Sequence, residues 1–124
     1  MRRRRARELI LRILFQKDFV DHTEGLESVS DLYALEVLRG IEAHQSEIDH
    51  IIEERAQGWR LERLHSVDRN LLRLAIYELL HGEGVPAEVV IDEAVELAKK
   101  YGTEKSPAFI NGILDRVLKE RATP

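Results

Sequence analysis

The 124-residue sequence contains no cysteine, only three prolines and seven glycines, and a single tryptophan. Without cysteine the chain can form neither a disulfide nor a thiolate metal site, which agrees with a protein of the reducing cytoplasm. The scarcity of proline and glycine favours long helices over many short strands. No apolar run approaches 18 residues, so we expect no membrane span. Charged residues interrupt the apolar run behind the N-terminal arginines, which argues against a signal peptide.

What remains is the composition of a folded globular chain. Hydrophobic residues make up 44% of the sequence and charged residues 34%, a balance that disordered chains lack. The length suits one domain with its own core, over residues 1–124. Apolar residues recur with the period of an α-helix, and no segment alternates long enough to form a strand. We therefore predict a single all-α domain of about six to seven helices.

Capping and breaker residues give the expected helix boundaries. The six segments are about residues 3 to 20; a helix capped by Ser28 or Ser30; a helix capped by Ser46 and ending near Gly58; a helix capped by Ser66 and ending at 82–84; Pro86 to Tyr101, closed by Gly102; and a helix opening at Ser106-Pro107 with a frayed tail at 120–124. The fourth segment is apolar on most of its circumference, which places it in the middle of a bundle. Asn111-Gly112 is typical of a hairpin turn, but the helical period continues around it. We interpret Gly112 as a point where two helices approach closely.

Positive charge is concentrated at the N-terminus. Residues 1–17 hold seven Lys/Arg and one acid, a formal charge of +6, whereas the remaining 107 residues carry −10. Five arginines among the first seven residues repel one another and serve no purpose in folding, so an external anion is the simplest partner. A solvated, frayed terminus is the alternative.

A helical wheel places an aromatic residue beside this charge. Phe15 falls opposite the centre of the core stripe, in line with Arg4 and Leu11 and flanked by Arg12. An outward aromatic ring among guanidinium groups suits single-stranded nucleic acid, because the ring stacks on a base while the arginines contact phosphates. Two alternatives remain: Leu11 and Phe15 form a second apolar stripe under another helix, or a homodimer covers Phe15.

The sequence offers no catalytic or metal-binding motif. No two of the histidines are separated by four residues along the chain: His22, His44, His50, His65 and His81. Without cysteine we therefore expect no metal site and no cofactor. Asp92, Glu93 and Glu96 are interpreted as the solvated side of a helix, with Glu96 and Lys100 forming an i,i+4 pair. No nucleophile elbow or acid–base dyad is present, so we do not expect an enzyme.

The apolar fourth segment also carries polar residues at a spacing of four: Arg69, Arg73 and Tyr77. A partly buried arginine must be paired, and Asp68, Glu78 or an acid from another helix could supply the carboxylate. A binding surface is the alternative interpretation of these three residues.

Four blocks of sequence resemble the NusB family of bacterial transcription antitermination factors. They recur in family order and span essentially the whole chain: Arg3 to Glu8 with Leu14-Phe15, Val67 to Leu79, Val85 to Gly102, and Phe109 to Asp115. The resemblance implies two packed helical bundles, with the first three helices packed across the rest. It also implies binding to the boxA element of nascent ribosomal RNA transcripts, together with the small-subunit ribosomal protein that doubles as NusE. With other antitermination factors, the complex would help RNA polymerase pass terminators. The alternative function is a protein-binding helical adaptor with a basic tail and no preference for an RNA sequence.

The charge pattern, the positions of residues on the helices and the resemblance together give the candidate binding residues. The RNA-binding set would be Arg2, Arg3, Arg4, Arg5, Arg7, Phe15, Gln16, Arg73, Tyr101 and Phe109. The partner-binding set would be Asp68, Arg69, Tyr77 and Lys105. Two positions depart from the family pattern: Lys105 stands where relatives often carry an acid, and Asp92 replaces a common Asn.

Overall fold

The computed structural model describes residues 2–18, 29–56, 60–82 and 84–122. These residues form six α-helices and one short 3-10 helix: α1 (Arg2–Lys17), α2 (Leu32–Ala43), α3 (Gln45–Arg55), η2 (Leu61–Arg63), α4 (Ser66–His81), α5 (Ala87–Tyr101) and α6 (Ser106–Ala122). Within the described ranges there is no strand, so the predicted all-α class is confirmed. Among the same residues, no helix is both long and apolar enough to cross a membrane.

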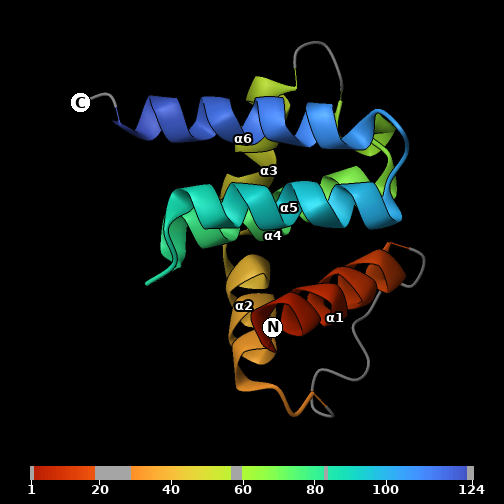
Figure 1. The fold of residues 1–124 in the computed structure, drawn as a ribbon, viewed down its shortest axis with the longest axis vertical. Helices are drawn as coiled ribbons and strands as arrows, with labels where there is room; N and C mark the ends of the chain where they lie inside the picture. Colours follow the sequence, from red (N-terminus) through yellow and green to blue (C-terminus); the bar gives the residue numbers. More distant parts are fainter. Residues whose placement is uncertain (1, 19–28, 57–59, 83, 123–124) are drawn as a thin grey trace.

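The helices form two packed groups. Helices α4 and α5 lie between α6 and the α1–α2 pair (Figure 1). One hydrophobic core joins α3, α4, α5 and α6, and a second, smaller core joins α1 and α2 to α4. The resemblance implied that the first three helices pack together across the rest. In the structure, α3 instead shares the core of α4–α6, through Ile48 and Ile52.

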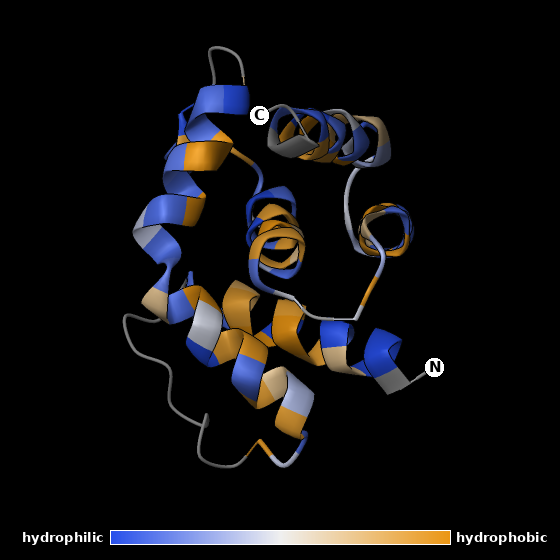
Figure 2. Ribbon diagram, turned by 90° about the vertical axis from the view of Figure 1, so that its left-hand side faces the viewer, coloured by the Kyte–Doolittle hydropathy of each residue, from blue (hydrophilic) through white to orange (hydrophobic). Residues whose placement is uncertain are grey.

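Helix α4 is the centre of the molecule, as its apolar circumference predicts. Leu71, Leu72 and Ile76 are fully buried in the larger core, whereas Leu74 points into the smaller one. The surrounding helices are amphipathic, and each carries both hydrophobic and hydrophilic residues (Figure 2). A helix with apolar residues on all sides is stable only when neighbours cover it, and α4 contacts each of the other α-helices of the described part.

The predicted caps are mostly wrong. Helix α2 is capped by Asp31, whose side chain accepts a hydrogen bond from the Ala34 N–H at 2.9 Å, and not by Ser30; Ser28 lies outside the described residues. Ser46 lies inside α3, because only His44 separates α2 from α3 and leaves no room for a separate cap. Ser66 is the first residue of α4, and its hydroxyl donates to Asp18 instead of capping the helix.

The other boundaries agree more closely with expectation. Pro86 is the N-cap residue of α5, and Gly102 is its C-cap residue. The expected fraying from residue 120 is not seen, because α6 continues to Ala122; residues 123–124 lie outside the described part. The ends expected near residue 20 and at Gly58 also fall on residues that are not described.

The close helix approach occurs at a different glycine from the one expected. A Cβ added to Gly112 would meet no atom within 4 Å. A Cβ added to Gly40 would lie 2.2 Å from the Tyr77 ring. Gly40 therefore lets α2 approach α4, whereas Gly112 borders open space.

Candidate nucleic-acid interface

Helix α1 begins with a group of exposed arginines. Arg3, Arg4 and Arg5 are all exposed, and the side chain of Arg2 lies outside the described part. The Arg3 guanidinium lies over the Tyr33 ring of α2, 4.2 Å from its centroid. Arg4 pairs with Glu93 of α5 at 2.7 Å. These two contacts fix the start of α1 between α2 and α5.

Arg7 is not part of the exposed group. It is 3% exposed, and its Nε and one terminal nitrogen donate to the two Glu78 carboxylate oxygens, both at 2.8 Å. Burial opposes the charge, but the hydrogen bonds and attraction of Glu78 outweigh it and raise the pKa of Arg7. The expectation that Arg7 lies on the RNA surface is therefore wrong, because this side of α1 faces α4.

Tyr33, which is only partly buried, completes this group. Its hydroxyl donates to Glu78. Burial, together with the hydrogen bond to the Glu78 carboxylate and its charge, raises the pKa of Tyr33 to about 12. The Arg7–Glu78–Tyr33 triad thus joins α1, α4 and α2 through one carboxylate.

Phe15 is presented at the surface, as the wheel predicts. It is 37% exposed, whereas Leu11, one turn earlier, is 4% exposed and belongs to the larger core. The alternative of a covered second stripe therefore holds for Leu11 and not for Phe15. Gln16, the next residue of α1, is also exposed.

A pocket of about 280 Å³ adjoins Phe15, between α1 and α5. We call it the α1–α5 pocket, and its lining is Glu8, Leu11, Arg12, Phe15, Val67 and Tyr101. Tyr101 is 41% exposed, so two helices each contribute an exposed aromatic ring. Arg12, also exposed, adds positive charge at the edge.

Glu8 holds the two helices together beside this pocket. Its carboxylate accepts from Lys100 Nζ and from the Tyr101 hydroxyl, both at 2.6 Å. These two hydrogen bonds lower the pKa of Glu8, and the one from Lys100 is the larger cause. The predicted Glu96–Lys100 pair is therefore wrong: Lys100 reaches across to α1, and Glu96 pairs with Lys99 at 3.0 Å.

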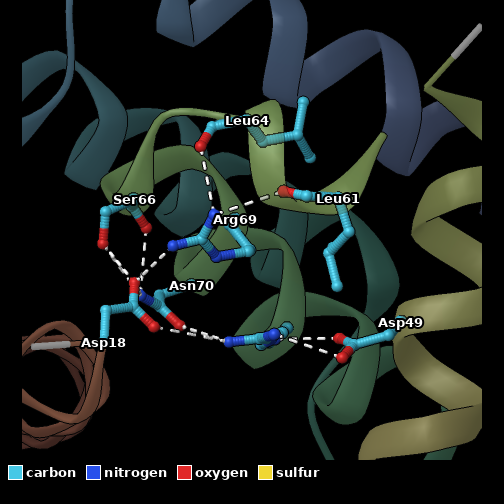
Figure 3. Close-up of polar contacts among 8 residues, drawn as sticks. Asp18, Asp49, Leu61, Leu64, Ser66, Arg69 and Asn70 are labelled. Atoms are coloured by element: carbon cyan, nitrogen blue, oxygen red, sulfur yellow. Dashed lines mark hydrogen bonds and ion pairs between the residues drawn. The ribbon is translucent and has the colours of Figure 1, made fainter. Parts of the chain in front are cut away.

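A polar network on α4 uses Arg69 and Arg73, the two α4 arginines predicted from the sequence to bind a partner or RNA (Figure 3). Arg69 pairs with Asp18 at 2.7 Å and donates to the carbonyls of Leu61 and Leu64. Arg73 makes a two-point contact with Asp49 of α3, at 2.8 and 3.1 Å. Both arginines are paired with acids from outside α4, not with Asp68 or Glu78.

This network is structural. The side chains of Arg69 and Arg73 are 14% and 11% exposed. Burial opposes the Asp18 charge, but hydrogen bonds from Ser66, Arg69 and Asn70 lower the pKa of Asp18 overall. The placement of Arg73 on the RNA surface and of Arg69 on the partner surface is therefore corrected: both guanidinium groups bind within the protein. Asp18 was missed from the sequence because it follows α1 and carries no local signal of its distant partners.

A second pocket gathers other assigned residues between η2, the start of α4 and the α5–α6 connection. Its volume is about 360 Å³, and its lining is Arg63, Leu64, His65, Asp68, Thr103, Lys105 and Phe109. We call it the Asp68 pocket. Asp68 is 8% exposed, and its Oδ1 atom has no hydrogen-bond partner among the described residues. A buried acceptor without a partner costs about 1–3 kcal/mol, so a donor from outside would be bound favourably here.

The fourth residue assigned to partner binding lies elsewhere. Tyr77 is half-buried, packs against both cores and contacts the surface of α2 at Gly40. The structure thus brings Asp68, Lys105 and Phe109 together and separates Tyr77 from them.

These features define an all-helical protein in which the junction of α1 with α5 carries the exposed Arg4 and Arg12 and two exposed aromatic rings. A family model described as the NusB family matches residues 4–119. The chain belongs to the NusB family.

Relatives and solved structures agree with this assignment. The transcription antitermination protein NusB of Desulfitobacterium hafniense (strain DSM 10664 / DCB-2) is 43% identical over 131 residues, covering 95% of this chain and 88% of the relative. The structure of T. maritima NusB is similar with a TM-score of 0.87 and 45% identity, over 95% of this chain and 91% of that one. A crystal structure of the antitermination factors NusB and NusE in complex with dsRNA gives a TM-score of 0.81 and 30% identity, over 97% and 99%.

Proposed function

We propose that this chain is an RNA-binding transcription antitermination factor of the cytoplasm, acting as one domain and without catalysis. It binds boxA-type single-stranded RNA of nascent ribosomal RNA transcripts together with NusE, and helps RNA polymerase pass terminators. One observation carries the proposal: the exposed Arg4 and Arg12 and both exposed aromatic rings lie along the same junction of α1 with α5. Arg4–Glu93 and Glu8–Lys100 mark that junction, and Phe15 and Tyr101 follow it.

The junction offers the two kinds of contact that single-stranded RNA needs. Arg4 and Arg12 supply charge for phosphates at the junction, and the exposed Arg3 and Arg5 extend that charge around the start of α1. Release of counterions makes such binding steeply dependent on salt. Phe15 and Tyr101 supply flat surfaces for bases, each worth about 1–3 kcal/mol when a base stacks on it. Glu8 lies close to the path, but its charge is already compensated by Lys100. It therefore orients Tyr101 without repelling the RNA strongly.

The Asp68 pocket is the proposed contact for the protein partner. The unpaired Asp68 Oδ1 would accept a donor from NusE, and Phe109 would pack beside it. Lys105 places a positive charge at this contact, so the matching position on the partner would carry an acid or a neutral group.

RNA binding measured with and without the ribosomal protein partner tests the proposal. We expect boxA RNA to bind more tightly than a scrambled RNA of equal length, and the partner to increase the difference. Arg4→Ala and Arg5→Ala should weaken binding and flatten the plot of log affinity against log salt. Arg39→Ala on α2 removes the same charge from another exposed position and should have a smaller effect. Equal affinity for both RNAs would favour the protein-binding adaptor instead.

A further inference from the structure

The corner where α2 meets α3 lies beside the end of α4 and gathers three metal-ligand side chains. His44 is the single residue between α2 and α3, Glu47 lies in the first turn of α3, and His81 is the last residue of α4. One ligand atom from each lies within 4.8 Å of the other two. His81 Nε2 and Glu47 Oε1 are 3.5 Å apart. The α2–α3 junction and the C-terminal end of α4 thus converge on one point.

The donor set and its spacing suit zinc. Two imidazole nitrogens and one carboxylate oxygen form a common three-residue zinc set, with water in the remaining position. Bonds of about 2.0–2.1 Å in a tetrahedral site separate the ligand atoms by about 3.4 Å. The distance between His81 and Glu47 already meets this value. The side chains of Glu47 and His81 are 55% and 32% exposed, so they can move the short distance that complete coordination requires.

Aromatic contacts hold the two histidines next to each other. The His44 and His81 rings are stacked, with centroids 4.1 Å apart and an angle of 21° between the planes. Tyr77 lies against both rings, at 6.3 and 5.3 Å. Nearly parallel rings direct their nitrogens side by side, so binding one ion requires a rotation of one ring out of the stack. His81 also lines an open pocket of about 310 Å³ with Arg3 and Glu36, which gives an ion and its water access from solvent.

We propose that His44, Glu47 and His81 bind one zinc ion, with water completing the coordination. The ion would tie the α2–α3 corner to the end of α4. Because α2 belongs to the smaller core and α3 to the larger one, bound zinc would fix the two helical groups relative to each other. This site lies away from the α1–α5 and Asp68 pockets and does not depend on the proposed function.

Isothermal titration of the metal-free full chain with ZnCl₂ tests the site. We expect saturable binding of one zinc per chain and no comparable binding of MgCl₂. His81→Ala and Glu47→Gln should each weaken zinc binding at least tenfold. His50→Ala is the matched control, because His50 and Glu54 form an exposed pair at 3.3 Å, and no third ligand joins them among the residues that the structure describes. It should bind zinc as the unmodified chain does.

Two further measurements separate coordination from a folding defect. Saturating zinc should raise the melting temperature of the unmodified chain and of His50→Ala but not of His81→Ala. Co²⁺ in place of zinc should give the visible absorption of a tetrahedral site, and His44→Ala should remove it. Absence of one-to-one binding would overturn the proposal, as would equal zinc affinity in His81→Ala or a loss confined to His50→Ala. Since no RNA or partner is present, failure here leaves the proposed function untouched.

Discussion

The Arg7–Glu78–Tyr33 triad, with its buried Arg7–Glu78 pair, gives the sharpest test of how this structure is held together. Arg7→Ala removes two charge-assisted hydrogen bonds of 2.8 Å and leaves the Glu78 carboxylate buried, with its side chain 2% exposed. Breaking a buried ion pair from one side costs about 3–5 kcal/mol. We expect the free energy of unfolding to fall by that amount, which is a large part of the total stability of a domain this size.

Urea unfolding followed by circular dichroism measures this loss. With a slope of about 1.5 kcal/mol per molar urea, the midpoint should fall by about 2–3 M. Arg4→Ala is the matched control, since its pair with Glu93 is 51% exposed on the arginine side, and such pairs contribute about 0–1 kcal/mol. Replacing both Arg7 and Glu78 with methionine should recover much of the loss, because apolar residues of similar volume tolerate burial. A midpoint for Arg7→Ala within about 0.5 M of the unmodified chain would refute this reasoning.

Three further predictions concern binding and pH. Phe15→Ala should weaken RNA binding by about 1–3 kcal/mol with little change in stability, whereas Leu11→Ala should reduce stability by about 2–5 kcal/mol; equal RNA affinity in a folded Phe15→Ala protein would remove the stacking role. The folded-state pKa of Asp18 is lowered, so its contribution to stability is present above its ordinary value of 3.8 and is lost as the pH falls through the lower folded value. The urea midpoint of Asp18→Asn should therefore be lower than that of the unmodified chain at neutral pH, and it should fall less as the pH is lowered. An equal fall of the midpoint at acid pH in both proteins would contradict this. The pKa of Tyr33 is raised to about 12, so its contribution is complete below pH 10 and is lost toward pH 12. Tyr33→Phe should lack that alkaline decline in melting temperature, and a parallel decline would show that other groups cause it.

Features of the fold that depend on local interactions could be predicted from the sequence. The period of apolar residues places α4 at the centre, and the angle of Phe15 on the α1 wheel follows from helix geometry alone. Both features are seen in the structure: α4 contributes to both cores, and Phe15 is exposed, although Leu11, in line with it on the wheel, is covered.

Side-chain contacts with partners far along the chain could not be predicted in the same way. Arg7 belongs to an arginine run, and no local pattern indicates that Glu78, 71 residues later, lies opposite it. Likewise, His44 and His81 are far apart along the chain, so their spacing gives no sign that they meet. Only the packing of α2 against α4 brings the two rings together. The prediction that Ser46 caps α3 was wrong for a related reason. Only His44 separates α2 from α3, and no residue in this stretch indicates from the sequence that the connection is so short.

The start of α1 has a consequence for the direction of a bound strand. Consecutive helical residues point about 100° apart, so Arg3, Arg4 and Arg5 fan out around the helix axis. Arg3 is directed to Tyr33 on one flank and Arg4 to Glu93 on the other. A linear polyanion that contacts all three must cross the axis of α1 at this end. Arg3, Arg4 and Arg5 would therefore fix the direction in which the RNA crosses the start of α1 before its bases reach Phe15.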